Sequence, residues 1–138
     1  MPAYLLDTSV YSQPLRRKPV FEALQRWQAF GDSSCKVSIV SIAEVEFGLH
    51  LEGSESRRQR YDALLKGRLE VIPTDPPIWH AFAKRKARQQ ILGRPVSDLD
   101  LLIASCAIHH QFTVATLNSR DFSKIEGCVW EDWSGRIL

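Results

Sequence analysis

The sequence is poor in the features that identify disulfide-stabilised, zinc-binding or membrane-spanning proteins. Its 138 residues include three cysteines, Cys35, Cys106 and Cys128, which are widely spaced and form no CxxC pair. This spacing argues against a disulfide framework and against a zinc site. No apolar run approaches the roughly 18 residues needed to cross a membrane, and no signal peptide is evident. We therefore expect a cytoplasmic protein without membrane contacts.

Excess charge and phosphate-binding glycine motifs are scarce too. The net charge of +2 is too small to indicate a nucleic-acid partner by itself. The chain lacks a GxSxG elbow, a GxxxxGK[ST] loop and a GxGxxG opening after its first apolar run. A hydrophobic content of 44% with 25% charged residues is typical of an ordinary globular protein. The length predicts one domain, spanning residues 1–138.

Short apolar runs alternate with helical patterns along the whole chain. The predicted strands cover residues 3–6, 37–40, 69–72 and 112–116, with a fifth, edge strand at 128–130. Helices are expected between these strands, and residues 16–19 form a polar break in the pattern. The alternation predicts an α/β fold, a single domain with a parallel β-sheet of four to five strands flanked by helices.

Polar side chains follow three of the predicted strands. Asp7 ends the first apolar run, Glu44 follows the second strand, and Asn118 and Asp121 follow the fourth. Ligands of open α/β sheets collect beyond the carboxyl ends of the strands, which favours a functional site there. Structural alternatives exist for two of these acids: Asp7 is placed to be only a helix N-cap, and Glu44 completes a capping box with Ser41.

A fourth acid begins the most apolar helical stretch, residues 97–108. Ser97 is the natural N-cap, which leaves Asp98 in the first turn near solvent. Asp98 and Asp100 lie about 200° apart around a helix, so both cannot face one site. Asp100 shares its face with small apolar residues, where an unpaired carboxylate is costly, so Asp100 is the candidate.

Clustered acids without nearby His or Cys suit hard cations such as Mg²⁺ or Mn²⁺. Such a cluster on a weakly basic protein favours a polyanionic substrate that reaches the acids through metal, with basic helices holding its phosphates. Without metal, the carboxylates should repel one another, and at least one should resist ionising. The candidate phosphate-binding residues are Arg57, Arg58, Arg60, Lys84, Arg85 and Arg88. A merely solvated helix face is the alternative reading of these charges.

Four segments together resemble the PIN-domain ribonucleases, and most closely the VapC-type toxins of bacterial toxin–antitoxin pairs. They are Leu5-Leu6-Asp7-Thr8-Ser9, Ser41-Ile42-Ala43-Glu44 with Gly48, Asp100-Leu101-Leu102-Ile103-Ala104, and Thr113 to Phe122. The resemblance implies an Mg²⁺-dependent endoribonuclease in which Mn²⁺ substitutes. It also implies a homodimer and a hetero-oligomer with a VapB-type, DNA-binding antitoxin.

By the same resemblance, three family acids carry over onto Asp7, Glu44 and Asp100. The fourth falls in many members where this chain has Asn118, so Asn118 or Asp121 is left to do its work. We expect Asp7 and Asp100 to bind the metal, Glu44 to close the site and Asp121 to assist catalysis. The predicted supporting residues, which orient carboxylates or water, are Thr8, Ser9, Thr116 and Asn118.

Two other function classes compete with a nuclease. A phospho-accepting receiver domain also has an Asp at a strand end, but it needs a further acidic pair that this chain does not offer after its first strand. A catalytically silent PIN-like binding module is favoured by Asn118 and disfavoured by the three retained acids. Labelling by acetyl phosphate would identify a receiver domain. Metal-dependent RNA cleavage would distinguish a nuclease from a silent binding module.

Overall fold

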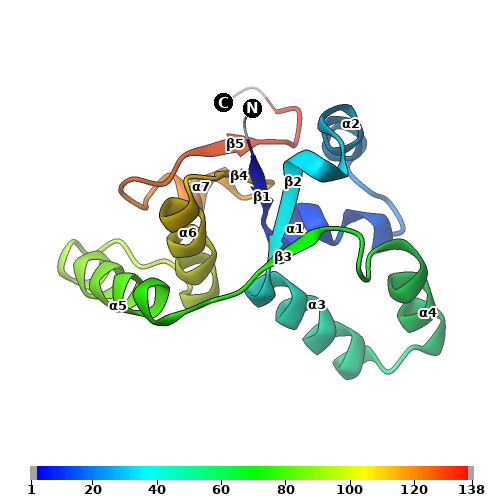
Figure 1. The fold of residues 1–138 in the computed structure, drawn as a ribbon, viewed down its shortest axis with the longest axis horizontal. Coiled ribbons are helices and arrows are strands. Elements are labelled where there is room, and N and C mark those ends of the chain that lie inside the picture. The colour runs from blue at the N-terminus through cyan, green and yellow to red at the C-terminus, as the bar shows by residue number, and fades with distance from the viewer. Residues whose placement is uncertain (1–2, 137–138) are drawn as a thin grey trace.

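Five parallel strands form the central sheet of the protein, which a computed structural model describes over residues 3–136 (Figure 1). The strands are β1 (Tyr4–Leu6), β2 (Cys35–Ser38), β3 (Glu70–Ile72), β4 (Thr113–Thr116) and β5 (Trp130–Asp132). Their order across the sheet is β3-β2-β1-β4-β5, and every neighbouring pair is parallel. The predicted α/β fold with a five-stranded parallel sheet is therefore confirmed, and the predicted domain 1–138 has its first and last two residues outside the described range.

Helices connect the strands and cover both faces of the sheet (Figure 1). They are α1 (Thr8–Tyr11), α2 (Phe21–Phe30), α3 (Ile39–Glu52), α4 (Glu55–Leu64), α5 (Pro76–Ile91), α6 (Asp98–His110) and α7 (Ser119–Phe122). Ser97, the predicted cap of α6, accepts the N–H of Asp100, and Asp75 caps α5 by accepting the N–H of Ile78. Within residues 3–136, no helix has the length and apolar character of a membrane span.

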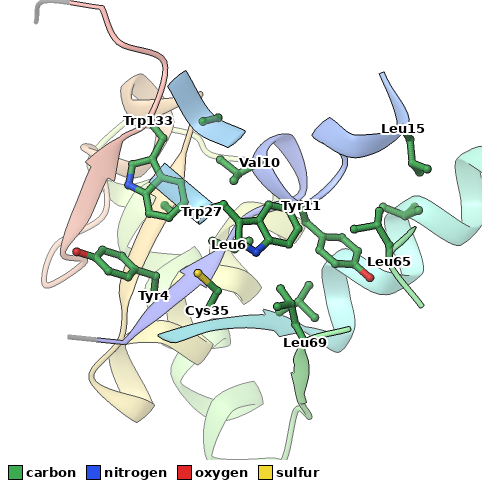
Figure 2. Packing of buried hydrophobic residues seen from close by; sticks show 14 of the residues in the cluster. Tyr4, Leu6, Val10, Tyr11, Leu15, Trp27, Cys35, Leu65, Leu69 and Trp133 are labelled. Atoms are coloured by element: carbon green, nitrogen blue, oxygen red, sulfur yellow. The ribbon is translucent and has the colours of Figure 1, made fainter. Parts of the chain in front are cut away.

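The side chains of β1 alternate between the two faces of the sheet, and the core accordingly has two layers. Tyr4 and Leu6 point to one face and Leu5 to the other, and all three are buried. On the first face, Figure 2 shows Trp27 of α2 packed near Leu6, and Trp133 beside Tyr4. On the second face, the middle of α6, residues 101–107, is buried, as its composition predicts. Fully burying such a side chain contributes about 1.5–3 kcal/mol each, so β1 is held firmly from both sides.

The second strand ends earlier than the sequence predicts. Residues 37–40 were expected to be extended, but β2 covers Cys35–Ser38, and Ile39 and Val40 already belong to α3. The hydroxyl of Ser38 accepts the N–H of Val40 at 3.1 Å and caps the helix. The β-branched pair favours a strand only weakly, and the cap with its tertiary contacts outweighs that preference. Ser41 thus lies inside α3, and the interpretation of Glu44 as part of a capping box is wrong.

Two other boundaries are also displaced. The edge strand predicted at residues 128–130 begins and ends two residues later, as β5 (Trp130–Asp132), and it pairs with β4. The sequence also predicts a short helix from Thr8 to Gln13 that stops at Pro14, but α1 ends at Tyr11 and the 3₁₀ turn over Gln13–Leu15 includes Pro14. Proline is tolerated there since it occupies a first-turn position. This turn brings Leu15 and Arg16 towards α4.

An acidic cluster at the carboxyl end of the sheet

Asp7 lies at the carboxyl end of the central strand and is only 3% exposed. Its Oδ1 accepts the hydroxyl of Ser9 at 2.6 Å and the backbone N–H of Val10 at 3.1 Å. Its Oδ2 accepts the hydroxyl of Thr116 at 2.6 Å, across from β4. Asp7 is therefore the N-cap of α1, as one interpretation predicts. A cap needs only one oxygen, however, and Oδ2 retains capacity for a further partner.

Burial raises the pKa of Asp7 to about 6, against an ordinary value of 3.8. The hydrogen bonds from Ser9, Thr116 and the Val10 amide oppose this rise, and the charge of Asp100 adds a smaller increase. The expectation that one carboxylate of the cluster resists ionising is confirmed. The main cause is loss of water around the charge, with repulsion between carboxylates second.

Glu44 is connected to the same end of the sheet through α1. The hydroxyl of Thr8 donates to its Oε1 at 2.6 Å and lies 2.9 Å from the hydroxyl of Ser41. Because Ser41 is buried one turn before Glu44 on α3, these contacts fix the carboxylate relative to β1. The contact of Ser41 was missed from the sequence, where this residue was expected to cap the helix.

Asp98 and Asp100 separate as the helix geometry predicts. Asp98 is exposed, and its carboxylate pairs with Lys86 of α5 at 3.1 Å. Asp100 is half-buried, and burial raises its pKa, with further increases from the charges of Asp121 and Glu44. The four acids Asp7, Glu44, Asp100 and Asp121 are therefore electrostatically coupled around Asp100.

Asn118 and Asp121 contact each other directly beyond β4. The side-chain amide of Asn118 donates to Oδ2 of Asp121 at 2.7 Å, and Lys124 lies 3.6 Å from Oδ1. The backbone N–H of Asn118 donates to the hydroxyl of Thr116, which in turn donates to Asp7. One chain of hydrogen bonds thus joins the fourth strand end to the first.

The donor chemistry of this cluster fits a hard divalent cation, since all its ligating atoms are carboxylate, amide or hydroxyl oxygens. In the described part of the chain, no three His, Cys, Asp or Glu side chains converge closely enough to hold an ion. The charges of the acids therefore act on one another at this edge of the sheet, although their side chains stay further apart than a metal site requires.

A hollow of about 220 Å³ opens beside Glu44. Its lining residues include Thr8 and Glu44 together with Arg16 and Arg57. Arg16 belongs to the stretch 16–19, which from the sequence is only a polar break. Its Arg-Arg-Lys composition was the available signal for a phosphate-binding role, and the contact between this stretch and α4 could not be predicted.

The predicted RNA-binding residues fall on two separate surfaces. Three of them lie on α4: Arg57, Arg58 and Arg60. Nη1 of Arg58 donates to both carboxylate oxygens of Glu46, at 2.7 and 2.9 Å. Lys84, Arg85 and Arg88 line a different hollow with Glu126, between α5 and the segment after α7. There, Arg88 pairs with Glu126 at 3.0 Å, and half-buried Arg85 donates to Ser105 at 3.2 Å.

A parallel sheet with coupled acids beyond its central strand defines an α/β protein with an acidic site at the carboxyl edge of the sheet. The PIN domain model matches residues 4–127, so the chain belongs to the PIN domain family. It is 28% identical to toxin FitB of Neisseria gonorrhoeae, with 94% of this chain and 97% of FitB covered. It is 27% identical to ribonuclease VapC1 of Haemophilus influenzae, with 95% and 98% covered.

A solved structure extends the likeness to three dimensions. The DNA-bound VapBC of Salmonella typhimurium superposes with a TM-score of 0.81 at 27% identity, covering 96% of this chain and 99% of that one. The resemblance to VapC-type toxins predicted from the four sequence segments is thereby confirmed. Membership of this family sets aside the receiver-domain alternative.

Proposed function

We propose that this protein is a metal-dependent endoribonuclease and the toxin of a type II toxin–antitoxin pair. The observation that carries the proposal is the coupling of Asp7, Glu44 and Asp100 at the carboxyl edge of a PIN-domain sheet. Relatives that share most of their length with this chain are named ribonucleases. We propose Mg²⁺ as the cofactor, with Mn²⁺ as a substitute, because only oxygen donors are gathered there.

In this proposal Asp7 and Asp100 hold the cation, and Glu44 closes the site directly or through water. A bound Mg²⁺ supplies polarisation of the phosphoryl oxygen and a more acidic water for hydrolysis. Ser9 and Thr116 fix the Asp7 carboxylate by donating to opposite oxygens, and Thr8 fixes that of Glu44. Such supporting contacts set ligand orientation, and removing one typically costs 10–100-fold in metal affinity or activity.

The proposal is tested with purified protein and single-stranded RNA in the presence of Mg²⁺, Mn²⁺ or EDTA. We expect cleavage with either metal, none with EDTA, and products with 5′-phosphate and 3′-hydroxyl ends. RNA binding without cleavage under every metal condition would instead favour the silent binding module. Sequencing the cleaved ends after brief expression in cells identifies the RNA.

Asn118→Asp is expected to tighten Mn²⁺ binding and to lower the stability of the metal-free protein. The substitution replaces an amide that donates to Asp121 at 2.7 Å with a second carboxylate, so the two oxygens repel until a cation neutralises them. Calorimetric Mn²⁺ titration and thermal unfolding in EDTA measure the two effects. Asp121→Asn is the companion variant, with reduced but measurable activity. An unchanged Mn²⁺ affinity in Asn118→Asp would show that this position does not face the cation.

The proposed homodimer has a candidate surface next to the acids. Ile39, Phe47, Trp79 and Leu99 are each at least 42% exposed and line an apolar hollow of about 510 Å³ that also touches Glu44. Stable homodimer interfaces are more apolar than the average surface, and this hollow has one charged lining residue. Trp79→Glu is expected to shift the protein to a monomer in sedimentation experiments, whereas exposed Ile91→Glu on the same helix should not. The VapB-type antitoxin is the second proposed partner.

A further inference from the structure

A groove rich in arginine runs outward from the acidic cluster between the 3₁₀ turn and α4. It encloses about 860 Å³, and its charged lining residues are Arg16, Arg17, Glu52, Arg57 and Arg60. Leu15, Arg16, Glu52 and Arg57 also line the hollow beside Glu44, so the two spaces adjoin. We call this space the arginine groove. Taking the proposed ribonuclease function as given, we propose that the arginine groove binds the RNA backbone on one side of the cleaved phosphate.

The charges of the groove are set up to receive an anion from outside. Four guanidinium groups face one carboxylate, Glu52. Within residues 3–136, neither Arg16 nor Arg17 forms an ion pair, and both are exposed. The Nε of Arg57 is buried, lies 3.2 Å from Glu52 and has no hydrogen-bond partner in the described structure. Arginine is well suited to phosphate because its planar fork can donate two hydrogen bonds to one group.

The walls of the groove are held in place by the fold. Arg60 Nε donates to the backbone carbonyl of Pro14 at 3.0 Å, which ties α4 to the 3₁₀ turn. The same turn follows α1 directly, so the arginines are anchored to the helix that Asp7 caps. The positions of the groove arginines relative to α1 are therefore set by the fold.

The position of the arginine groove next to the hollow beside Glu44 favours RNA over an acidic protein segment as its ligand. A nucleic-acid backbone carries a negative charge at every nucleotide, so it can extend from a cation at the acids to the arginines beyond. A bound peptide draws its affinity from apolar or aromatic anchors in closed pockets, and Leu15 is the one large apolar residue lining the groove. The absence of aromatic residues from this lining also indicates contacts with phosphates rather than stacked bases.

The second predicted basic surface, formed by Lys84, Arg85 and Arg88, lies away from the hollow beside Glu44. The hollow with Lys84, Arg85 and Arg88 shares no lining residue with the hollow beside Glu44. Glu126 already pairs with Arg88 there, and Ser105 holds Arg85. Both surfaces are candidates from the sequence, but the arginine groove is the one that adjoins the hollow beside Glu44.

The test compares Arg16→Gln/Arg17→Gln with wild type in the binding of a fluorescent 20-nucleotide single-stranded RNA. Anisotropy is measured in EDTA, which prevents metal-dependent cleavage, across a series of salt concentrations. The slope of log K against log salt is negative, and each lost phosphate contact reduces its magnitude by about 0.7. For the two lost contacts we therefore expect the magnitude to fall by about 1.4. Arg26→Gln/Arg94→Gln removes the same two charges from exposed positions outside the groove and should keep the wild-type slope.

The outcomes separate this proposal from the function on which it rests. If wild type neither binds nor cleaves RNA, the proposed function fails. If wild type binds RNA but Arg16→Gln/Arg17→Gln keeps its slope, or if Lys84→Gln/Arg88→Gln lowers the slope more, the groove assignment is overturned and the function stands. An unchanged RNA slope together with lost binding of a glutamate-rich peptide would likewise overturn it, because the groove would then be a protein site. Circular dichroism confirms that each variant is folded.

Discussion

Asp7→Asn is expected to abolish RNA cleavage and to leave the metal-free protein at least as stable as wild type at pH 7.5. The loss of activity follows from the proposed role of Asp7 as a metal ligand. The unimpaired stability follows from burial, because the wild-type carboxylate must hold a negative charge away from water. The amide can keep Val10 and Ser9 on its oxygen and present its NH₂ to Thr116.

The effect should depend on pH in a defined direction. The folded pKa of about 6 lies above the ordinary 3.8, so the unfolded chain releases this proton first as pH rises. The contribution of Asp7 to stability is present below about pH 4 and is lost as pH rises through 6, by a total of about 3 kcal/mol. In urea unfolding in EDTA, the free energy of unfolding of Asp7→Asn should therefore rise relative to that of wild type between pH 4.5 and pH 7.5.

Two controls make this result specific. Asp7→Ala removes the helix cap as well as the charge and should cost about 1 kcal/mol relative to Asp7→Asn. Added Mg²⁺ should raise the midpoint of unfolding of wild type and not that of Asp7→Asn, since a cation that binds the folded state stabilises it. A variant that still cleaves RNA, or that becomes less stable as pH rises, would contradict the role given to Asp7.

Asp100→Asn should lower cleavage by more than about 100-fold, and Asp98→Asn should leave it near the wild-type rate. The two acids are two residues apart on one helix, which makes them a matched pair. Asp98 is exposed and paired with Lys86, whereas the charges of Glu44 and Asp121 act on Asp100. Losing a ligand should exceed the 10–100-fold typical of losing a supporting contact.

Initial rates on one RNA, with Mn²⁺ affinity measured in parallel, check this prediction. Asp98→Asn breaks only an exposed ion pair, which contributes little to stability, so both variants should remain folded. An active Asp100→Asn beside an inactive Asp98→Asn would mean that the helix presents its other face to the substrate. Glu44→Gln serves as a third variant, since its carboxylate belongs to no capping box and has no cap to lose.

The sequence was informative where local rules decide the structure. The cap at Ser97, the burial of the first apolar run and the orientation of Asp100 all follow from spacing within one element. The start of α3 was misplaced because Ser38 and Ser41 are equally good caps in sequence, and the β-branched residues between them favour a strand. Packing of α1 against α3 decides between the two serines.

The pairing of charges could not be predicted from the sequence at all. Arg58 and Arg16 look alike in a basic stretch, yet Arg58 is taken up by Glu46 twelve residues away and Arg16 lies beside the acids. Which basic residue is neutralised depends on how α4 and the 3₁₀ turn approach each other. That approach is a long-range property of the fold, which no local pattern encodes.

The hydrogen bond between Asp7 and Thr116 joins residues 109 positions apart, and β4 lies beside the first strand of the chain. A chain still emerging from the ribosome therefore lacks the hydrogen bond from Thr116 to Asp7 until β4 has been made. For the proposed ribonuclease, this order of assembly delays the appearance of activity. Fragments left by interrupted translation before residue 113 would have β1 as an exposed edge and no second support for Asp7, and we expect them to be harmless to the cell that makes them.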